Sequence, residues 1–264
     1  MNRFALALCV VVLCVGQLDA APLDLSGWTP LTLHYFTGQP AGNWVLDSEN
    51  TAVTQTINAD PSFYLNNLNQ TSYSMDGSWQ VQTGSDDDFM GFVFGYQNSS
   101  NFYLFDWKQG SQSYVGRTAA EGMTLRKMTG STGDALNDLT LADFWDNQVD
   151  HGGSTILATN HGNTKGWADY AMYDFHLDFN VNYAGEIHIV VKQDDTVLWD
   201  VAETDTTFSS GQFGFYNFSQ QTVRYAGFEQ EGRVVVPETS SLIVWSLLGA
   251  LGAAIGWYRR RRTA

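Results

Sequence analysis

The chain has 264 residues, of which 28 are Asp or Glu and 13 are Lys or Arg, and its formal net charge is −15 at pH 7. Binding to nucleic-acid phosphates needs clustered Lys and Arg side chains, so this balance excludes nucleic acid as a partner. The acidic excess favours solubility or cation binding, and composition does not choose between these two.

Residues 1–20 have the pattern of a secretory signal peptide. Arg3 gives a positively charged start, and the apolar core from Phe4 to Val15 is too short to span a bilayer comfortably. Both cysteines of the chain, Cys9 and Cys14, lie in this segment. We therefore expect an exported protein whose mature form has no disulfide and depends on a large core or on bound ions.

Residues 21–233 form the predicted folded domain, in which short apolar runs rich in aromatic and β-branched residues alternate with polar turns. Such runs are typical of β-strands. After one or two short entry strands between residues 23 and 50, the expected strands are 53–57, 74–83, 89–96, 102–107, 123–128, 170–179, 186–192, 197–201, 211–218 and 222–229. This series predicts an all-β sandwich or barrel.

Three other local features have their own predictions. Asn58 to Pro61 is expected to turn the chain, and Asp76–Gly77 is expected to form a hairpin-type turn, with Asp76 as a turn residue rather than a ligand. Apolar positions at helical spacing predict a short helix within Ala135–Trp145. His151 and His161 are expected in loops.

The segments Phe89–Tyr96 and Phe102–Trp107 flank a short polar turn and predict a β-hairpin. Their side chains are mostly apolar on both faces, which indicates inner strands of a packed sandwich rather than an exposed ribbon. Gly91 and Gly95 interrupt the first strand, where glycine usually marks a bulge or a close approach of two backbones.

Three adjacent acids, Asp86, Asp87 and Asp88, directly precede this hairpin. Like charges in a row repel one another and lower stability unless something compensates. A solvated acidic turn is one interpretation. A site for a hard cation is the other, because Ca²⁺ takes several oxygen ligands from Asp carboxylates and backbone carbonyls.

Several segments match one known family in the same order. Gln55–Pro61 has the sequence QTINADP, and Asp86–Gln109 begins with DDDFMGFVFGYQ. Later landmarks are Gly166–Trp167 followed by Asp169, Gly211–Gly214 and Phe218–Gln220. This set, which covers about Asp47 to Glu229, resembles the C-terminal domain of the thrombospondins. The resemblance implies an all-β, lectin-like (concanavalin-type) jelly-roll β-sandwich.

The same resemblance implies a function. It points to an exported, calcium-binding, non-catalytic module for adhesion or extracellular-matrix association, with an extracellular polysaccharide or a matrix protein as partner. It also makes Asn58 and Asp60 candidate Ca²⁺ contacts beside Asp86, Asp87 and Asp88.

Residues 234–264 form a separate tail. An uncharged apolar segment, 240–258, approaches the roughly 20 residues that cross a bilayer, and Arg259 to Arg262 follow it. Arginines at this position stay in the cytoplasm, which places the sandwich outside. The order V-P-E, apolar span, arginine cluster resembles the PEP-CTERM sorting signal, although Thr239 stands where that pattern has a second Pro. The resemblance implies an exosortase-type enzyme as partner and a cell-surface or extracellular location, at least transiently anchored by this helix.

Two alternative functions stay open. A carbohydrate-binding lectin is suggested by the fold and by Trp107 and Trp167 as candidates for exposed rings. A glycosidase-like enzyme needs two carboxylates at a fixed separation, and the nearest match to its E-x-D-x-x-E strand motif, Glu203–Phe208, lacks the second Glu. No G-x-S-x-G or H-E-x-x-H motif occurs.

The spacing of the histidines indicates no transition-metal site. Those in predicted strands are expected to be ordinary packed or rim residues. The five are His34, His151, His161, His176 and His188.

Overall fold

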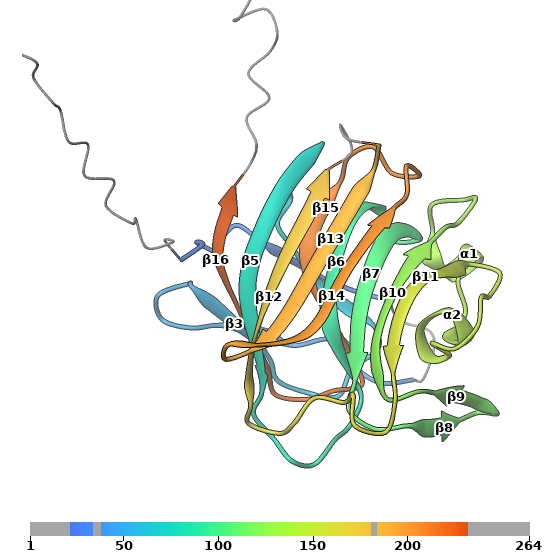
Figure 1. Ribbon diagram of the computed structural model, residues 1–264, viewed down its shortest axis with the longest axis horizontal. Helices are drawn as coiled ribbons and strands as arrows, with labels where there is room; N and C mark the ends of the chain where they lie inside the picture. The colour runs from blue at the N-terminus through green and yellow to red at the C-terminus, as the bar shows by residue number, and fades with distance from the viewer. Residues whose placement is uncertain (1–21, 34–37, 181–183, 232–264) are drawn as a thin grey trace, which may run out of the picture.

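The computed structural model describes residues 22–33, 38–180 and 184–231 (Figure 1). The predicted signal peptide, residues 1–20, and the predicted tail with its apolar span, residues 240–258, lie outside the described residues. Among the described residues, no helix has the length and apolar character needed to cross a bilayer.

Two seven-stranded antiparallel sheets make up most of the described part of the chain. Sheet A has the order β1 (Thr29–Thr32), β4 (Ser62–Leu65), β15 (Gln212–Phe218), β6 (Phe89–Asn98), β7 (Asn101–Lys108), β10 (Gly122–Met128) and β11 (Ser154–His161). Sheet B has the order β14 (Thr196–Thr204), β13 (Glu186–Gln193), β12 (Met172–Asn180), β5 (Ser72–Val81), β16 (Val223–Glu231), β3 (Ala52–Gln55) and β2 (Trp44–Leu46).

Smaller elements accompany sheet A. A two-stranded ribbon consists of β8 (Gln112–Tyr114) and β9 (Arg117–Ala119), and two short helices are α1 (Ala135–Asp138) and α2 (Leu141–Trp145). Figure 1 shows the helices and the ribbon beside β10 and β11, at the right of the view. The architecture confirms the predicted all-β sandwich, and the predicted single helix is two short helices.

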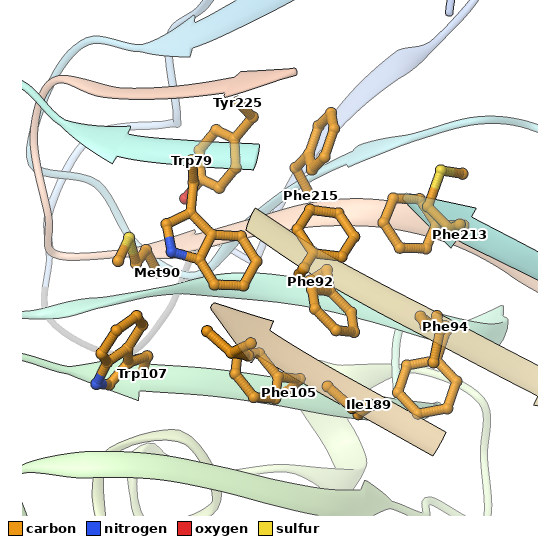
Figure 2. Packing of buried hydrophobic residues seen from close by; sticks show 14 of the residues in the cluster. Trp79, Met90, Phe92, Phe94, Phe105, Trp107, Ile189, Phe213, Phe215 and Tyr225 are labelled. Carbon is orange, nitrogen blue, oxygen red and sulfur yellow. The ribbon is translucent and has the colours of Figure 1, made fainter. Parts of the chain in front are cut away.

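The main core lies between the two sheets and consists largely of aromatic rings (Figure 2). Trp79 of β5 stacks on Phe175 of β12, with ring centroids 4.8 Å apart. Phe92 of β6, in sheet A, lies at the same centroid distance from Phe175. Aromatic pairs add stabilisation beyond the area that they bury, so these contacts join the sheets firmly.

A second core covers the outer face of sheet A. Trp145 of α2 packs edge-on against Phe89 of β6, with centroids 5.6 Å apart, and against Phe218 of β15 at 5.9 Å. Sheet A is therefore buried on both faces. This arrangement confirms the prediction that the hairpin of β6 and β7 is internal, and it adds that helices, rather than another sheet, cover the second face.

The two glycines of β6 have the predicted roles. A Cβ atom on Gly91 would lie 2.0 Å from the backbone oxygen of Phe105, so only glycine permits this close approach of β6 and β7. Gly95 has a φ of +56°, and the β6–β7 ladder shifts register between Phe94 and Asn98. Gly95 is thus part of a β-bulge.

Two local predictions are wrong. Asp76 and Gly77 form no turn, because they lie inside the ten-residue strand β5. Gly77 is needed for packing instead: a Cβ atom there would lie 2.5 Å from the Phe175 ring. His161 is the last residue of β11 rather than part of a loop. The sequence does not predict this strand, because it is an edge strand with mostly half-buried side chains and no clear alternation.

Candidate functional site

The three adjacent acids converge at the start of β6. One carboxylate oxygen from each of Asp86, Asp87 and Asp88 lies within 4.8 Å of the others, which is close enough for the three to hold one metal ion. Among the described residues, no other group of acids, histidines or cysteines meets this distance criterion. The side chain of Asp88 is 7% exposed, whereas that of Asp87 is 42% exposed. The cluster therefore extends from the surface into the protein.

A buried lysine lies against the inner end of the cluster. Lys108, the last residue of β7, pairs with Phe89 across the ladder and is fully buried. Its Nζ donates to Asp88 Oδ1 at 2.9 Å and to the backbone oxygen of Asp87 at 2.8 Å. The same ammonium lies 5.3 Å from the Phe89 ring centroid and 5.2 Å from that of Trp145. Lys108 therefore neutralises Asp88 from inside the fold.

Asp86 lacks such a partner. Its Oδ1 accepts the backbone N–H of Asp87 at 3.2 Å, whereas its Oδ2 is buried and accepts no hydrogen bond from the described residues. Asn58 Oδ1 is also buried and also lacks a hydrogen-bond partner among the described residues. Burial, and next the charge of Asp88, raise the pKa of Asp86 to about 6, although a hydrogen bond with the Asn58 side chain acts to lower it. An incompletely compensated carboxylate therefore lies beside the paired one.

The segment containing Asn58 and Asp60 is held near the acids by the turn after β15. The N–H of Ser219 donates to the backbone oxygen of Ala59 at 2.9 Å, and the side-chain oxygen of Gln220 accepts the N–H of Asp88 at 2.9 Å. Asp60 is 1% exposed and is not one of the three converging carboxylates. The structure thus brings Asp86, Asp87 and Asp88 together, with Asn58 beside Asp86, and places Asp60 deeper.

The two tryptophans that the sequence makes candidates for exposed rings are buried. Trp107 is 1% exposed and Trp167 is 2% exposed, so neither offers a ring face for stacking on a sugar. Trp107 belongs to the main core and donates its indole N–H to the backbone oxygen of Lys165 at 2.6 Å.

A cavity of about 280 Å³ lies next to Trp107. Its wall combines the rings of Trp107 and Tyr173 with the polar side chains of Asn160, Lys165 and Gln193. Mixed aromatic and hydrogen-bonding walls are typical of small-ligand sites.

In the weak glycosidase-like motif, Asp205 is held by two neighbouring side chains. Asp205 accepts hydrogen bonds from Lys127 Nζ and from the Tyr103 hydroxyl, each at 2.6 Å. Burial acts to raise the pKa of Asp205, but the hydrogen bonds from Lys127 and Thr207 prevail and hold it at about 2. A carboxylate kept ionised in this way cannot act as a general acid at neutral pH.

Comparisons with known proteins agree with the fold and the motifs. Residues 39–233 match the model of the family described as Thrombospondin C-terminal region. Thrombospondin-2 of Gallus gallus is 32% identical over 227 residues, which cover 82% of this chain and 18% of that protein. Thrombospondin-2 of Homo sapiens is 30% identical over 222 residues, covering 80% of this chain and 18% of that protein. The chain thus spans about a fifth of the length of these curated relatives.

One solved structure supports the lectin-like architecture. The exoplasmic/lumenal domain of VIP36, in its Ca²⁺/Man3GlcNAc-bound form, superposes with a TM-score of 0.50 and 10% sequence identity. The match covers 84% of this chain and 91% of that one. At this identity the similarity concerns the fold alone.

Proposed function

Because the chain belongs to the Thrombospondin C-terminal region family, we propose that it is a non-catalytic, calcium-binding module that acts outside the cell in adhesion or matrix association. The partner is an extracellular polysaccharide or a matrix protein. The observation that carries the calcium part is the pair of buried oxygens without hydrogen bonds, Asp86 Oδ2 and Asn58 Oδ1, next to a converging acid cluster.

The donor set fits a hard cation. Carboxylate and amide oxygens are the ligands that Ca²⁺ prefers, and it tolerates flexible geometry. Asp86, Asp87 and Asn58 are the residues best placed to hold it. Lys108 already pairs with Oδ1 of Asp88, so Asp88 contributes its charge and its other oxygen. Asp60, which is 1% exposed, lies two residues further along the same segment as Asn58. Bound there, calcium would supply the positive charge that Asp86 lacks.

The chain's own residues determine what such binding does to the fold. Asp86 to Asp88 lead into β6, Asn58 follows β3, and Ser219 follows β15. The cluster therefore joins segments that lead into both sheets. Holding these segments together stabilises one edge of the sandwich and fixes its surface for a partner.

The test is thermal unfolding of the purified full-length chain in EGTA and in millimolar Ca²⁺, with Mg²⁺ as the control ion. At a free Ca²⁺ concentration a hundredfold above Kd, ligand linkage adds about 2.7 kcal/mol. For a domain of this size that corresponds to a rise in Tm of roughly 5–10 °C. Asp86→Asn should lose most of this rise and keep the Tm measured in EGTA.

Asp195→Asn is the matched control, because Asp195 is an exposed acid between β13 and β14. This variant should retain the full calcium response. A Tm that is the same in EGTA and in Ca²⁺ for the wild-type chain would remove the calcium part of the proposal.

We propose that the protein acts outside the cytoplasm. Residues 1–20 act as the export signal, and residues 234–264 act as a sorting tail whose span, 240–258, anchors the chain at least transiently. An exosortase-type enzyme is the partner of this tail. The support for both assignments is the sequence pattern.

A second candidate function is carbohydrate binding, favoured by the cavity beside Trp107. The similar fold of VIP36 was solved with Man3GlcNAc, which is consistent with a sugar site on such a sandwich. If this function holds, a glycan array should detect binding, and Lys165→Ala combined with Gln193→Ala should weaken it at least tenfold. Lys192→Ala, which changes a residue outside the cavity wall, should bind as the wild type does. Silence on a broad array would reject this candidate.

A further inference from the structure

The outward face of sheet B carries a row of alternating histidines and aspartates that crosses four neighbouring strands. His176 and Asp178 come from β12, His188 from β13, Asp76 from β5 and Asp200 from β14. Their sequence neighbours on β12 and β13 belong to the main core, so period-two alternation turns this row to the solvent. These strands run side by side in Figure 1.

The side chains of this row are accessible to solvent, and the pairing of their strands fixes their positions. The side chains of His176 and His188 are 34% and 33% exposed, and that of Asp178 is 38% exposed. Asp178 and His188 pair directly across the β12–β13 ladder, and His176, two residues before Asp178 on β12, is the diagonal neighbour of His188. His176 and Asp178 share a face of β12 through their spacing of two residues, and the β12–β13 register brings His188 to them.

Asp178 lies between the two imidazole rings. Its Oδ2 is 3.2 Å from His176 Nε2 and 4.0 Å from His188 Nδ1, and the ring centroids are 6.3 Å apart. In a tetrahedral zinc site with bonds of about 2.0–2.1 Å, neighbouring ligand atoms lie about 3.4 Å apart. The first pair already has this spacing. The second requires His188 to move inward by roughly 0.6 Å or more. The two rings must also approach each other, because the three ligand atoms do not all lie within 4.8 Å of one another as those of the acid cluster do.

In each of these three side chains, the polar atom that points away from the other two has its own hydrogen-bond partner. His176 Nδ1 is 2.8 Å from Asp76 Oδ1, and His188 Nε2 is 2.9 Å from Asp200 Oδ1. The hydroxyl of Ser74 donates to Oδ1 of Asp178. In metal sites, a ligating histidine almost always gives its other nitrogen to a carboxylate, carbonyl or water, and a ligating carboxylate is itself hydrogen-bonded. Here the outer nitrogens are occupied, and the inner nitrogens face Asp178.

We propose that His176, Asp178 and His188 bind one transition-metal ion of the zinc class on the outward face of sheet B, with solvent completing the coordination. Asp76 and Asp200 orient the two rings, and Ser74 orients the carboxylate. Imidazole nitrogen suits Zn²⁺ and not Ca²⁺, which takes oxygen ligands, so this site is independent of the acid cluster before β6. It would give a role to two histidines that the sequence predicts to be ordinary packed or rim residues.

The experiment is calorimetric titration of the full-length chain with ZnCl₂ in buffer containing saturating Ca²⁺, which occupies any oxygen-only site. One equivalent of Zn²⁺ should bind. His188→Gln and His176→Gln should each weaken this binding at least tenfold. Asp76→Asn should weaken it about tenfold, since loss of an orienting partner typically costs 10–100-fold in metal affinity.

His151→Gln is the matched control, because His151 also lies beside a carboxylate, Asp146, at 3.3 Å. It should bind Zn²⁺ as the wild type does. Adding Co²⁺ instead gives a second readout, since a tetrahedral site with nitrogen ligands produces visible absorption bands, which should be absent in His188→Gln. Thermal unfolding in EDTA verifies that each variant is folded.

Two results would overturn the assignment. If the wild-type chain binds no more tightly than the His176→Gln/His188→Gln double variant, the row consists of ion pairs only. If His151→Gln loses as much affinity as His188→Gln, the metal binds scattered surface histidines rather than this site.

Discussion

Asp106→Ala should lower the free energy of unfolding by about 3–5 kcal/mol, the loss typical when one partner of a buried ion pair is removed. Asp106 Oδ2 lies 2.5 Å from Arg126 Nη2, and both side chains are essentially inaccessible to solvent. Arg126 also donates from Nη1 to the backbone oxygen of Asp143 at 2.8 Å. Without Asp106, the guanidinium would remain buried between sheet A and α2 with its charge uncompensated.

Chemical denaturation of the full-length chain measures this loss. The double variant Asp106→Ala/Arg126→Met should lose less than Asp106→Ala alone, because no isolated charge remains buried. Arg224→Ala is the surface control: its guanidinium lies 3.8 Å from Asp47, the two side chains are 35% exposed, and such pairs contribute about 0–1 kcal/mol. If Asp106→Ala lost no more than Arg224→Ala, the pair would not stabilise the fold.

Lys108→Met should make the stability of the protein strongly dependent on calcium. In EGTA this variant should lose about 3–5 kcal/mol, since Asp88 would stay buried without its cation. In millimolar Ca²⁺ the loss should be smaller, because a divalent ion at the acid cluster replaces part of the missing positive charge. The rise in Tm on adding Ca²⁺ should therefore be larger in Lys108→Met than in the wild type.

Lys127→Met is the comparison for this experiment. Lys127 also pairs with an aspartate, Asp205, at 2.6 Å, but that pair lies far along the sequence from the acid cluster and its two side chains are 19% and 13% exposed. This variant should lose less stability than Lys108→Met and should keep the wild-type calcium response. An identical calcium response in Lys108→Met and the wild type would place the cation away from Asp86 to Asp88.

The sequence predicts most strands because a sandwich imposes period-two alternation on them. The prediction fails where tertiary contacts override local preference. Asp76–Gly77 has the composition of a turn, yet β5 continues through it because the Phe175 ring packs where a side chain would be. The sequence does not predict β11 for a different reason. It is an edge strand that buries few side chains, so its sequence has no regular apolar pattern.

The residues of the candidate sites also differ in whether the sequence predicts that they meet. Asp86, Asp87 and Asp88 are adjacent in the chain, so the sequence alone brings them together. Lys108 reaches Asp88 only through the β6–β7 register, which places it opposite Phe89. His176 and His188 likewise meet only through the β12–β13 register. Contacts across strands depend on the pairing register, and turn residues and apolar patterns do not determine which residues face each other across two strands.

The strand order has a consequence for how the molecule is made. Of the strands that the structure describes, the last two along the chain are internal: β15 lies between β4 and β6, and β16 lies between β5 and β3. Neither sheet can close while the chain is still growing, and each incomplete sheet presents open edges that can pair with other chains. Such non-local pairing also makes folding slow. A product that stops before residue 212 therefore lacks an internal strand of each sheet, and its open edges make it prone to aggregation.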